Sequence, residues 1–242
     1  MFKTNFETGI FDKARVRLGF VLRVLVAAIG LAYSSVLGFS IVSAPMDKTD
    51  LLVGITFAGS TTDADRVYLQ NSLYILRDNL PEWYAYVADA KPFVVSVGQT
   101  DDEGWVVAKT TCCDDQGNGR ITFDDHLGNL AASSDPEDQT TQARQVAFLS
   151  ALVHEVTHLR DYRAGRIPAK MDATACIASE GAAYAKEFEF KRAVISAKMD
   201  GDRSGELYRR AAEKQLAEDE QVFSGNFWKL YCILAHPNVM DD

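Results

Sequence analysis

Residues 140–165 read TTQARQVAFLSALVHEVTHLRDYRAG, and most of the sequence-based prediction depends on this stretch. A threonine at its start and a glycine at its end are typical helix boundaries. Between them the apolar side chains recur on one broad face, namely Phe148, Leu149, Leu152, Val153, Val156 and Leu159. We therefore predict one long helix that packs through this face against the rest of the domain.

The predicted helix carries two histidines four residues apart, His154 and His158, with Glu155 directly after the first. Residues four apart lie on the same side of a helix, so both imidazoles can reach one metal ion. Glu155 projects about 100° around the helix, where its carboxylate can accept a proton from a metal-bound water. The alternative is that both histidines only pack in a core, but this would bury Glu155 without a partner.

The sequence His154-Glu155-Val156-Thr157-His158 resembles the HExxH motif of the zincin metallopeptidases. The resemblance implies one Zn²⁺ per chain, held by both histidines and a third protein ligand. In the metzincin class that ligand lies six residues after the second histidine, behind a glycine, whereas this chain has Ala164 and Asp161 at those positions. In the gluzincin class the third ligand is a glutamate on a following helix, and the chain resembles a compact member of that class.

A second helix is predicted over residues 171–198, and Glu180 within it is our choice for the third ligand because small residues flank it. Glu187 and Glu189 are competitors, but their basic neighbours are typical of a solvated face with ion pairs. Asp161, seven residues after His154 on the same helix face as both histidines, is a further candidate, either as a ligand or as a group that orients an imidazole.

Two features depart from the gluzincin pattern. Its NExxxD sequence is missing, since Ser179 precedes Glu180 and Tyr184 replaces the aspartate. Tyr184 is either a hydrogen-bond donor for the oxyanion of the reaction or a core aromatic residue. His236 is a weaker candidate for the same role.

The fold class expected is α+β, with a small mixed or antiparallel sheet followed by a helical half. Leu69, Leu73, Leu76 and Leu80 give one apolar face to a helix that begins after Thr61 or Thr62. Strands are expected over residues 51–57, 93–97, 105–108 and 120–123. In zincins the strand before the active-site helix is a sheet edge that pairs with the substrate backbone, a role we predict for Ile121, Thr122 and Phe123.

A twelve-residue stretch, 114–125, partly matches a calcium-binding loop. Gln116 and Asp125 occupy positions where that loop needs an acidic residue and a bidentate glutamate. The Gly-Asn-Gly sequence at 117–119 is equally typical of a hairpin turn, which we prefer to a calcium site.

The N-terminus differs from the rest of the chain in charge and hydropathy. The 21 residues from Val24 to Ala44 carry no charge and reach roughly 30 Å as a helix, the thickness of a bilayer core. Five basic residues precede this segment, so we expect residues 1–23 in the cytoplasm, 24–44 as a single-pass signal anchor and 45–242 as an extracytoplasmic domain. Cleavage after Ala44, which would secrete the domain, and a buried soluble helix are the alternatives.

The whole chain has a formal charge of −9, and no basic cluster occurs after the N-terminal segment. This composition argues against nucleic acid as a partner, because binding to a phosphate backbone needs clustered lysine and arginine. The four cysteines permit three pairings in two disulfides. We expect Cys112 and Cys113 either to form disulfides with Cys176 and Cys232 or to stay reduced, because a disulfide between adjacent residues strains the peptide bond that joins them.

Together these features predict a zinc metallopeptidase acting on a peptide or protein substrate, with Glu155 as general base. A non-catalytic zinc-binding or protein-interaction domain with a vestigial site is the alternative. The substrate and the oligomeric state do not follow from the sequence.

Overall fold

The computed structural model describes residues 50–100, 106–114, 117–129, 140–168, 171–197 and 202–235. The predicted cytoplasmic segment and membrane anchor, residues 1–44, and the candidate His236 lie outside these ranges. Within the described ranges, every helix is too short or too polar to cross a bilayer.

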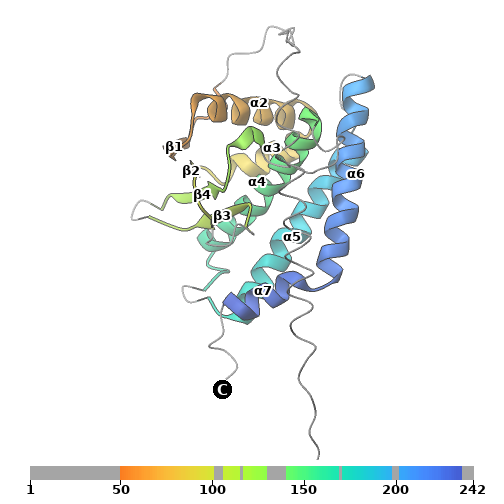
Figure 1. The fold of residues 1–242 in the computed structure, drawn as a ribbon. Coiled ribbons are helices and arrows are strands. Elements are labelled where there is room, and N and C mark those ends of the chain that lie inside the picture. The colour runs from red at the N-terminus through yellow and green to blue at the C-terminus, as the bar shows by residue number, and fades with distance from the viewer. Residues whose placement is uncertain are drawn as a thin grey trace, which may run out of the picture.

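The described chain is α+β, with one four-stranded mixed sheet and six α-helices (Figure 1). The strands are β1 (Ile55–Gly59), β2 (Phe93–Val97), β3 (Ala108–Thr111) and β4 (Gly119–Phe123), in the spatial order β1-β2-β4-β3. The β1, β2 and β4 strands are parallel, and β3 runs antiparallel to β4. The sheet is therefore mixed, and β2 has the predicted bounds. The strand predicted at 105–108 begins at its last residue and continues to Thr111, because Ala108 to Thr111 is the stretch that pairs with β4.

Two helices, α2 (Asp63–Asn79) and α3 (Pro81–Ala88), connect β1 to β2. Thr62 caps α2: its hydroxyl accepts from the Asp65 backbone N–H, while the Asp65 carboxylate accepts from the Thr62 N–H. The apolar face predicted for α2 is confirmed, since Leu69, Leu73, Leu76 and Leu80 are all buried in the core.

The helical half follows the sheet and consists of α4 (Thr141–Arg163), α5 (Ala173–Ser196), α6 (Asp202–Ser224) and α7 (Phe227–Ala235). A 3-10 turn, η1 (Leu127–Asn129), precedes α4. The α4 helix packs against β3 and β4 on one side and against α5 and α6 on the other, so it lies at the centre of the molecule (Figure 1). All six members of its predicted apolar face are buried.

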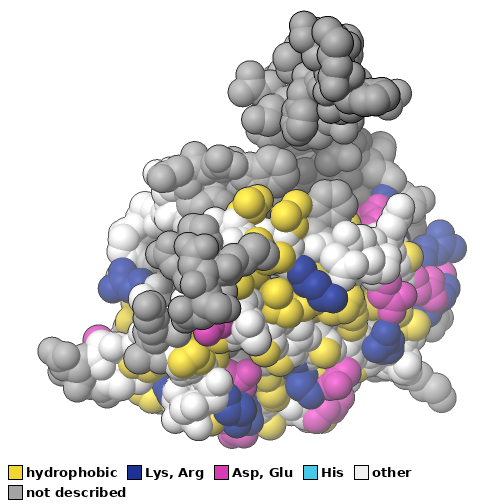
Figure 2. All heavy atoms as spheres, turned by 90° about the horizontal axis from the view of Figure 1, so that it is seen from below, with side chains coloured by type: hydrophobic (Ala, Val, Ile, Leu, Met, Phe, Trp, Pro, Cys, Tyr) yellow, Lys and Arg dark blue, Asp and Glu magenta, His cyan; other side chains and the backbone are white. Residues whose placement is uncertain are grey.

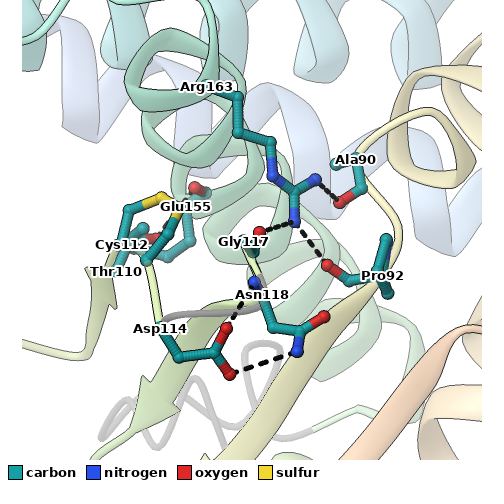
Figure 3. Close-up of a disulfide and its surroundings, with 10 residues drawn as sticks. Ala90, Pro92, Thr110, Cys112, Asp114, Gly117, Asn118, Glu155 and Arg163 are labelled. Atoms are coloured by element: carbon teal, nitrogen blue, oxygen red, sulfur yellow. Dashed lines mark hydrogen bonds between the residues drawn. A yellow bond between two sulfur atoms is a disulfide. The ribbon is translucent and has the colours of Figure 1, made fainter.

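The disulfide pairing differs from the prediction. Cys176 of α5 is bonded to Cys232 of α7, with 5.6 Å between their Cα atoms. Cys112 is bonded to its neighbour Cys113, so neither of these two reaches the helical half (Figure 3). The reason is their location in the fold. Cys112 and Cys113 directly follow β3, whereas Cys176 and Cys232 lie on α5 and α7, which pack against each other.

Candidate metal centre

The first part of the site is the middle of α4, a helix that Thr140 caps through its hydroxyl and the Ala143 backbone N–H. One helical turn brings the rings of His154 and His158 to a centroid distance of 4.9 Å. Both histidines and Glu155 are buried. On the face drawn in Figure 2, acidic, basic and apolar side chains are interspersed, and no histidine side chain of the described residues is visible there.

The second part is the first half of α5, which Asp172 caps by accepting from the Ala175 N–H at 2.7 Å. From there Glu180 points at the two imidazoles of α4. Its Oε2 lies 3.2 Å from His154 Nε2, and its Oε1 lies 3.4 Å from His158 Nε2. The small side chains around it, with Ala183 fully buried, let α5 approach α4 closely.

These three side chains bring their ligand atoms to one point. His154 Nε2 and His158 Nε2 are 3.2 Å apart, and each lies 3.2–3.4 Å from one of the two Glu180 carboxylate oxygens, Oε2 for His154 and Oε1 for His158. Zinc bonds to nitrogen and oxygen of roughly 2.0–2.1 Å place tetrahedral ligands about 3.3–3.4 Å apart. His154, His158 and Glu180 therefore form a group that could hold a metal ion, since one ligand atom from each lies within 4.8 Å of the others.

The Nδ1 atoms of the two imidazoles have hydrogen-bond partners that favour metal binding through the Nε2 atoms. His154 Nδ1 lies 3.1 Å from Glu187 Oε2, and His158 Nδ1 lies 2.9 Å from Ser179 Oγ. A proton on each Nδ1, donated to these oxygens, leaves a lone pair on each Nε2. Both lone pairs then face Glu180, as metal ligation requires.

Two residues take roles other than those predicted. Glu187 does not belong to a solvated face: its side chain is 12% exposed and contacts His154, because this position is two turns beyond Glu180 on the same side of α5. Asp161 orients no imidazole, because its carboxylate accepts from Arg166 Nε at 2.9 Å instead. Glu189 does lie at the surface, paired with Lys186.

Burial and hydrogen bonding oppose each other in the electrostatics of this cluster. Burial lowers the pKa of His154, but hydrogen bonds to Glu180 and Glu187 raise it well above the ordinary value. Burial likewise raises the pKa of Glu180, while the two imidazoles lower it more strongly. For Glu187 the net effect of burial, His154 and Lys191 is a pKa of about 2. Both carboxylates are therefore ionised at neutral pH, and their negative charge favours a bound cation.

Glu155 lies at the junction of α4 with the sheet. Its backbone carbonyl accepts from the Thr110 hydroxyl of β3 at 2.9 Å (Figure 3). Its negative charge helps to raise the pKa of both His154 and Tyr184, so its carboxylate is electrostatically coupled to the centre.

Tyr184 packs against the centre from α5, with its ring edge to face against His154 at 4.7 Å between centroids. Burial, followed by the charges of Glu180 and Glu187, raises the pKa of its hydroxyl far above the usual value. The same ring also contacts Phe188, Phe223 and Trp228. Of the two roles weighed from the sequence, the structure shows the aromatic one: Tyr184 belongs to an aromatic cluster beside His154.

The predicted substrate-binding strand is wrong. Ile121, Thr122 and Phe123 belong to β4, which is paired with β2 on one side and with β3 on the other. Ile121 and Phe123 are fully buried, and the Thr122 hydroxyl is bonded to Ser96. The sheet edge next to α4 is β3, because the chain turns back after β3 and inserts β4 between β3 and β2.

The segment weighed as a calcium loop includes the connection between β3 and β4. Its Asp114 accepts from the backbone and side-chain N–H groups of Asn118, at 2.8 and 3.1 Å (Figure 3). Arg163 of α4 donates to the Gly117 carbonyl nearby. These contacts are those of a hairpin, which agrees with the preferred interpretation, while Gln116 lies outside the described residues.

No protein-family model, curated protein or solved structure matches the chain. Only the residues and the geometry of the candidate centre therefore indicate a function.

Proposed function

We propose that this protein is a zinc-dependent metallopeptidase of gluzincin-like form, with His154, His158 and Glu180 as the zinc ligands. The observation that supports it best is the convergence of His154, His158 and Glu180, whose ligand atoms lie within 4.8 Å of one another, beside a glutamate that immediately follows the first ligand. Two histidines and one carboxylate are the donor set of many catalytic zinc sites, which keep a fourth position open.

A zinc ion held by His154, His158 and Glu180 would supply a water molecule with a pKa lowered to about 7 and a Lewis acid for the peptide carbonyl. Glu155 accepts the proton of the attacking water and then delivers it to the leaving amine. Tyr184, whose hydroxyl stays protonated because its pKa is raised, donates a hydrogen bond to the oxyanion. Glu187 and Ser179 keep the two imidazoles in the orientation needed for ligation.

The edge strand β3 replaces β4 as the proposed binding site for the substrate backbone. It borders α4, and Thr110 of β3 is bonded to the residue that we propose as general base. An extended peptide added to this edge would form main-chain hydrogen bonds, which explains binding without strict sequence selectivity. A peptide or protein is accordingly the proposed substrate.

The proposed location follows from residues 1–44, which we continue to interpret as a cytoplasmic N-terminus and a single membrane anchor. The metallopeptidase domain then lies outside the cytoplasm. The Cys176–Cys232 disulfide is compatible with such an oxidising compartment.

The test compares the full-length wild-type protein with Glu155→Gln, both purified in detergent and loaded with zinc. We expect equal zinc content and cleavage of a quenched-fluorescent peptide library by the wild type, with a loss of about 100-fold or more in Glu155→Gln. Zinc binding without hydrolysis by the wild type would favour the non-catalytic alternative. Equal hydrolysis by both proteins would exclude Glu155 as the base.

A further inference from the structure

A chain of charged side chains leads from the proposed centre to α6. Glu187 of α5 contacts His154 Nδ1 through Oε2 at 3.1 Å and Lys191 Nζ through Oε1 at 2.7 Å. Lys191 in turn forms an ion pair with Asp219 of α6. We propose that Lys191 and Asp219 are positioning residues that hold Glu187 against His154 and thereby raise the zinc affinity of the centre. This inference rests on the proposed function.

The geometry at Glu187 shows how the positioning works. Its two carboxylate oxygens take different partners, one the ammonium of Lys191 and the other the imidazole of His154. Two anchors fix the plane of the carboxylate, whereas one would leave a long side chain free to rotate. Lys191 therefore determines where Oε2 points, and Asp219 does the same for the Lys191 ammonium.

The burial of Lys191 indicates a role beyond packing. Its side chain is 3% exposed, while that of Glu187 is 12% exposed. Removing a charged pair from water is costly, and apolar residues of similar size often stabilise a fold as well or better. A methionine would fill this place without that penalty. The charged pair contributes something that packing does not need, namely a fixed acceptor behind a proposed zinc ligand.

The competing explanation is an ion pair that merely joins α5 to α6, and the protein contains a natural control for it. Arg192 and Glu220 are the next residues along the same two helices and form an ion pair at 2.7 Å. Both are about half exposed, and Arg192 does not contact Glu187 or His154 in any described hydrogen bond or ion pair. A change there perturbs the connection between the helices without touching the centre.

The experiment measures zinc affinity of the full-length protein in detergent by competition with a chromophoric chelator. We expect Lys191→Met to weaken zinc binding about tenfold, Glu187→Gln by a similar factor and Asp219→Asn about threefold. Arg192→Met should stay within about twofold of the wild type. Thermal melting of the zinc-free proteins, followed by circular dichroism, identifies any variant that fails to fold. If Lys191→Met does not fold, the zinc affinity of Asp219→Asn tests the proposal in its place.

A second readout follows the hydrogen bond itself. In the zinc-loaded wild type the His154 Nδ1 proton should give a downfield NMR resonance, and its chemical shift should be the same in Arg192→Met. In Lys191→Met this resonance should shift upfield. Folded Lys191→Met and Asp219→Asn proteins with wild-type zinc affinity would overturn the positioning role alone. A wild-type protein that binds no zinc would overturn the proposed function together with it.

Discussion

Two histidine–carboxylate contacts lie in different parts of the molecule and are built differently. Where α2 meets η1, the Asp65 carboxylate accepts from the Thr62 and Leu127 backbone N–H groups as well as from His126 Nδ1. Where α4 meets α5, the described hydrogen bonds and ion pairs of Glu180 go to imidazole nitrogens, His154 Nε2 and His158 Nε2.

The difference distinguishes a carboxylate that joins parts of the fold from one that belongs to a candidate metal centre. Backbone donors satisfy Asp65 within the fold, so the contact with His126, a half-exposed residue, fixes one loop onto one helix. Glu180 is instead paired with the two imidazoles, and a bound cation could satisfy all three together. The number of histidines that converge and the absence of backbone donors to Glu180 among the described contacts distinguish the candidate metal centre.

The largest effect expected is on zinc binding by Glu180→Ala. It removes one of three proposed ligands, so zinc affinity should fall by more than about 100-fold, because loss of an outer partner alone costs roughly 10- to 100-fold. The chelator competition described above measures it. His126→Ala, which alters the structural contact, should bind zinc like the wild type. Wild-type affinity in Glu180→Ala would show that the two contacts do not differ as described.

The converse change is Asp65→Ala, which should lower the free energy of unfolding by about 3 kcal/mol without affecting zinc affinity. The reason is that the buried Leu127 N–H would lose its acceptor, and the capping contacts of the exposed Thr62 with Asp65 would be lost as well. Urea denaturation followed by tryptophan fluorescence measures it. Asp63→Ala, at a fully exposed position in the same helical turn, should change stability by less than about 0.5 kcal/mol. Equal losses in both variants would contradict the structural role of Asp65.

Gly119→Ala should destabilise the protein by about 2 kcal/mol, because a Cβ at this place in β4 would collide with Leu159 Cδ1 of α4. Leu159 is fully buried and follows His158 directly, so the clash should also displace the metal-binding turn. Gly98→Ala is the control, since its Cβ would meet no atom within 4 Å. A wild-type urea midpoint for Gly119→Ala would mean that α4 and β4 do not pack as closely as described.

The smallest effect concerns acid. Burial raises the pKa of Asp65, but the hydrogen bonds from Thr62, His126 and Leu127 lower it further, so its folded-state pKa is below the usual value. Such a group stabilises the fold above the unfolded-state pKa of about 3.9, and this contribution is lost as the pH falls below that value. The stability difference between wild type and Asp65→Asn should therefore be constant from pH 7 to about pH 5 and shrink below about pH 4. A difference that grew on acidification would contradict this sign.

Local pattern was sufficient to predict the helices and the grouping of residues in the candidate metal centre. The apolar spacing and caps of α2 and α4 are properties of neighbouring residues, and the four-residue spacing of His154 and His158 alone places them on one side of α4. Glu180 was found from its small neighbours, which reflect close packing of two helices.

Long-range pairing could not be predicted in this way. The position of β4 between β2 and β3 depends on how the chain folds back, which no single strand encodes. The sequence predicts an exposed Glu187, because basic neighbours are typical of a solvated face. In the structure its basic partner Lys191 is itself buried, because α6 packs over it, and this long-range contact does not follow from the local sequence. The spacing of seven residues between Glu180 and Glu187, two turns on one face, is the signal that could have identified it.

The most direct test of the central claim is zinc K-edge X-ray absorption on the full-length, zinc-loaded protein. A centre formed by His154, His158 and Glu180 predicts about one zinc per chain with nitrogen and oxygen neighbours at roughly 2.0–2.1 Å, two of them imidazoles. Sulfur neighbours at about 2.3 Å, or a protein that retains no zinc, would contradict it.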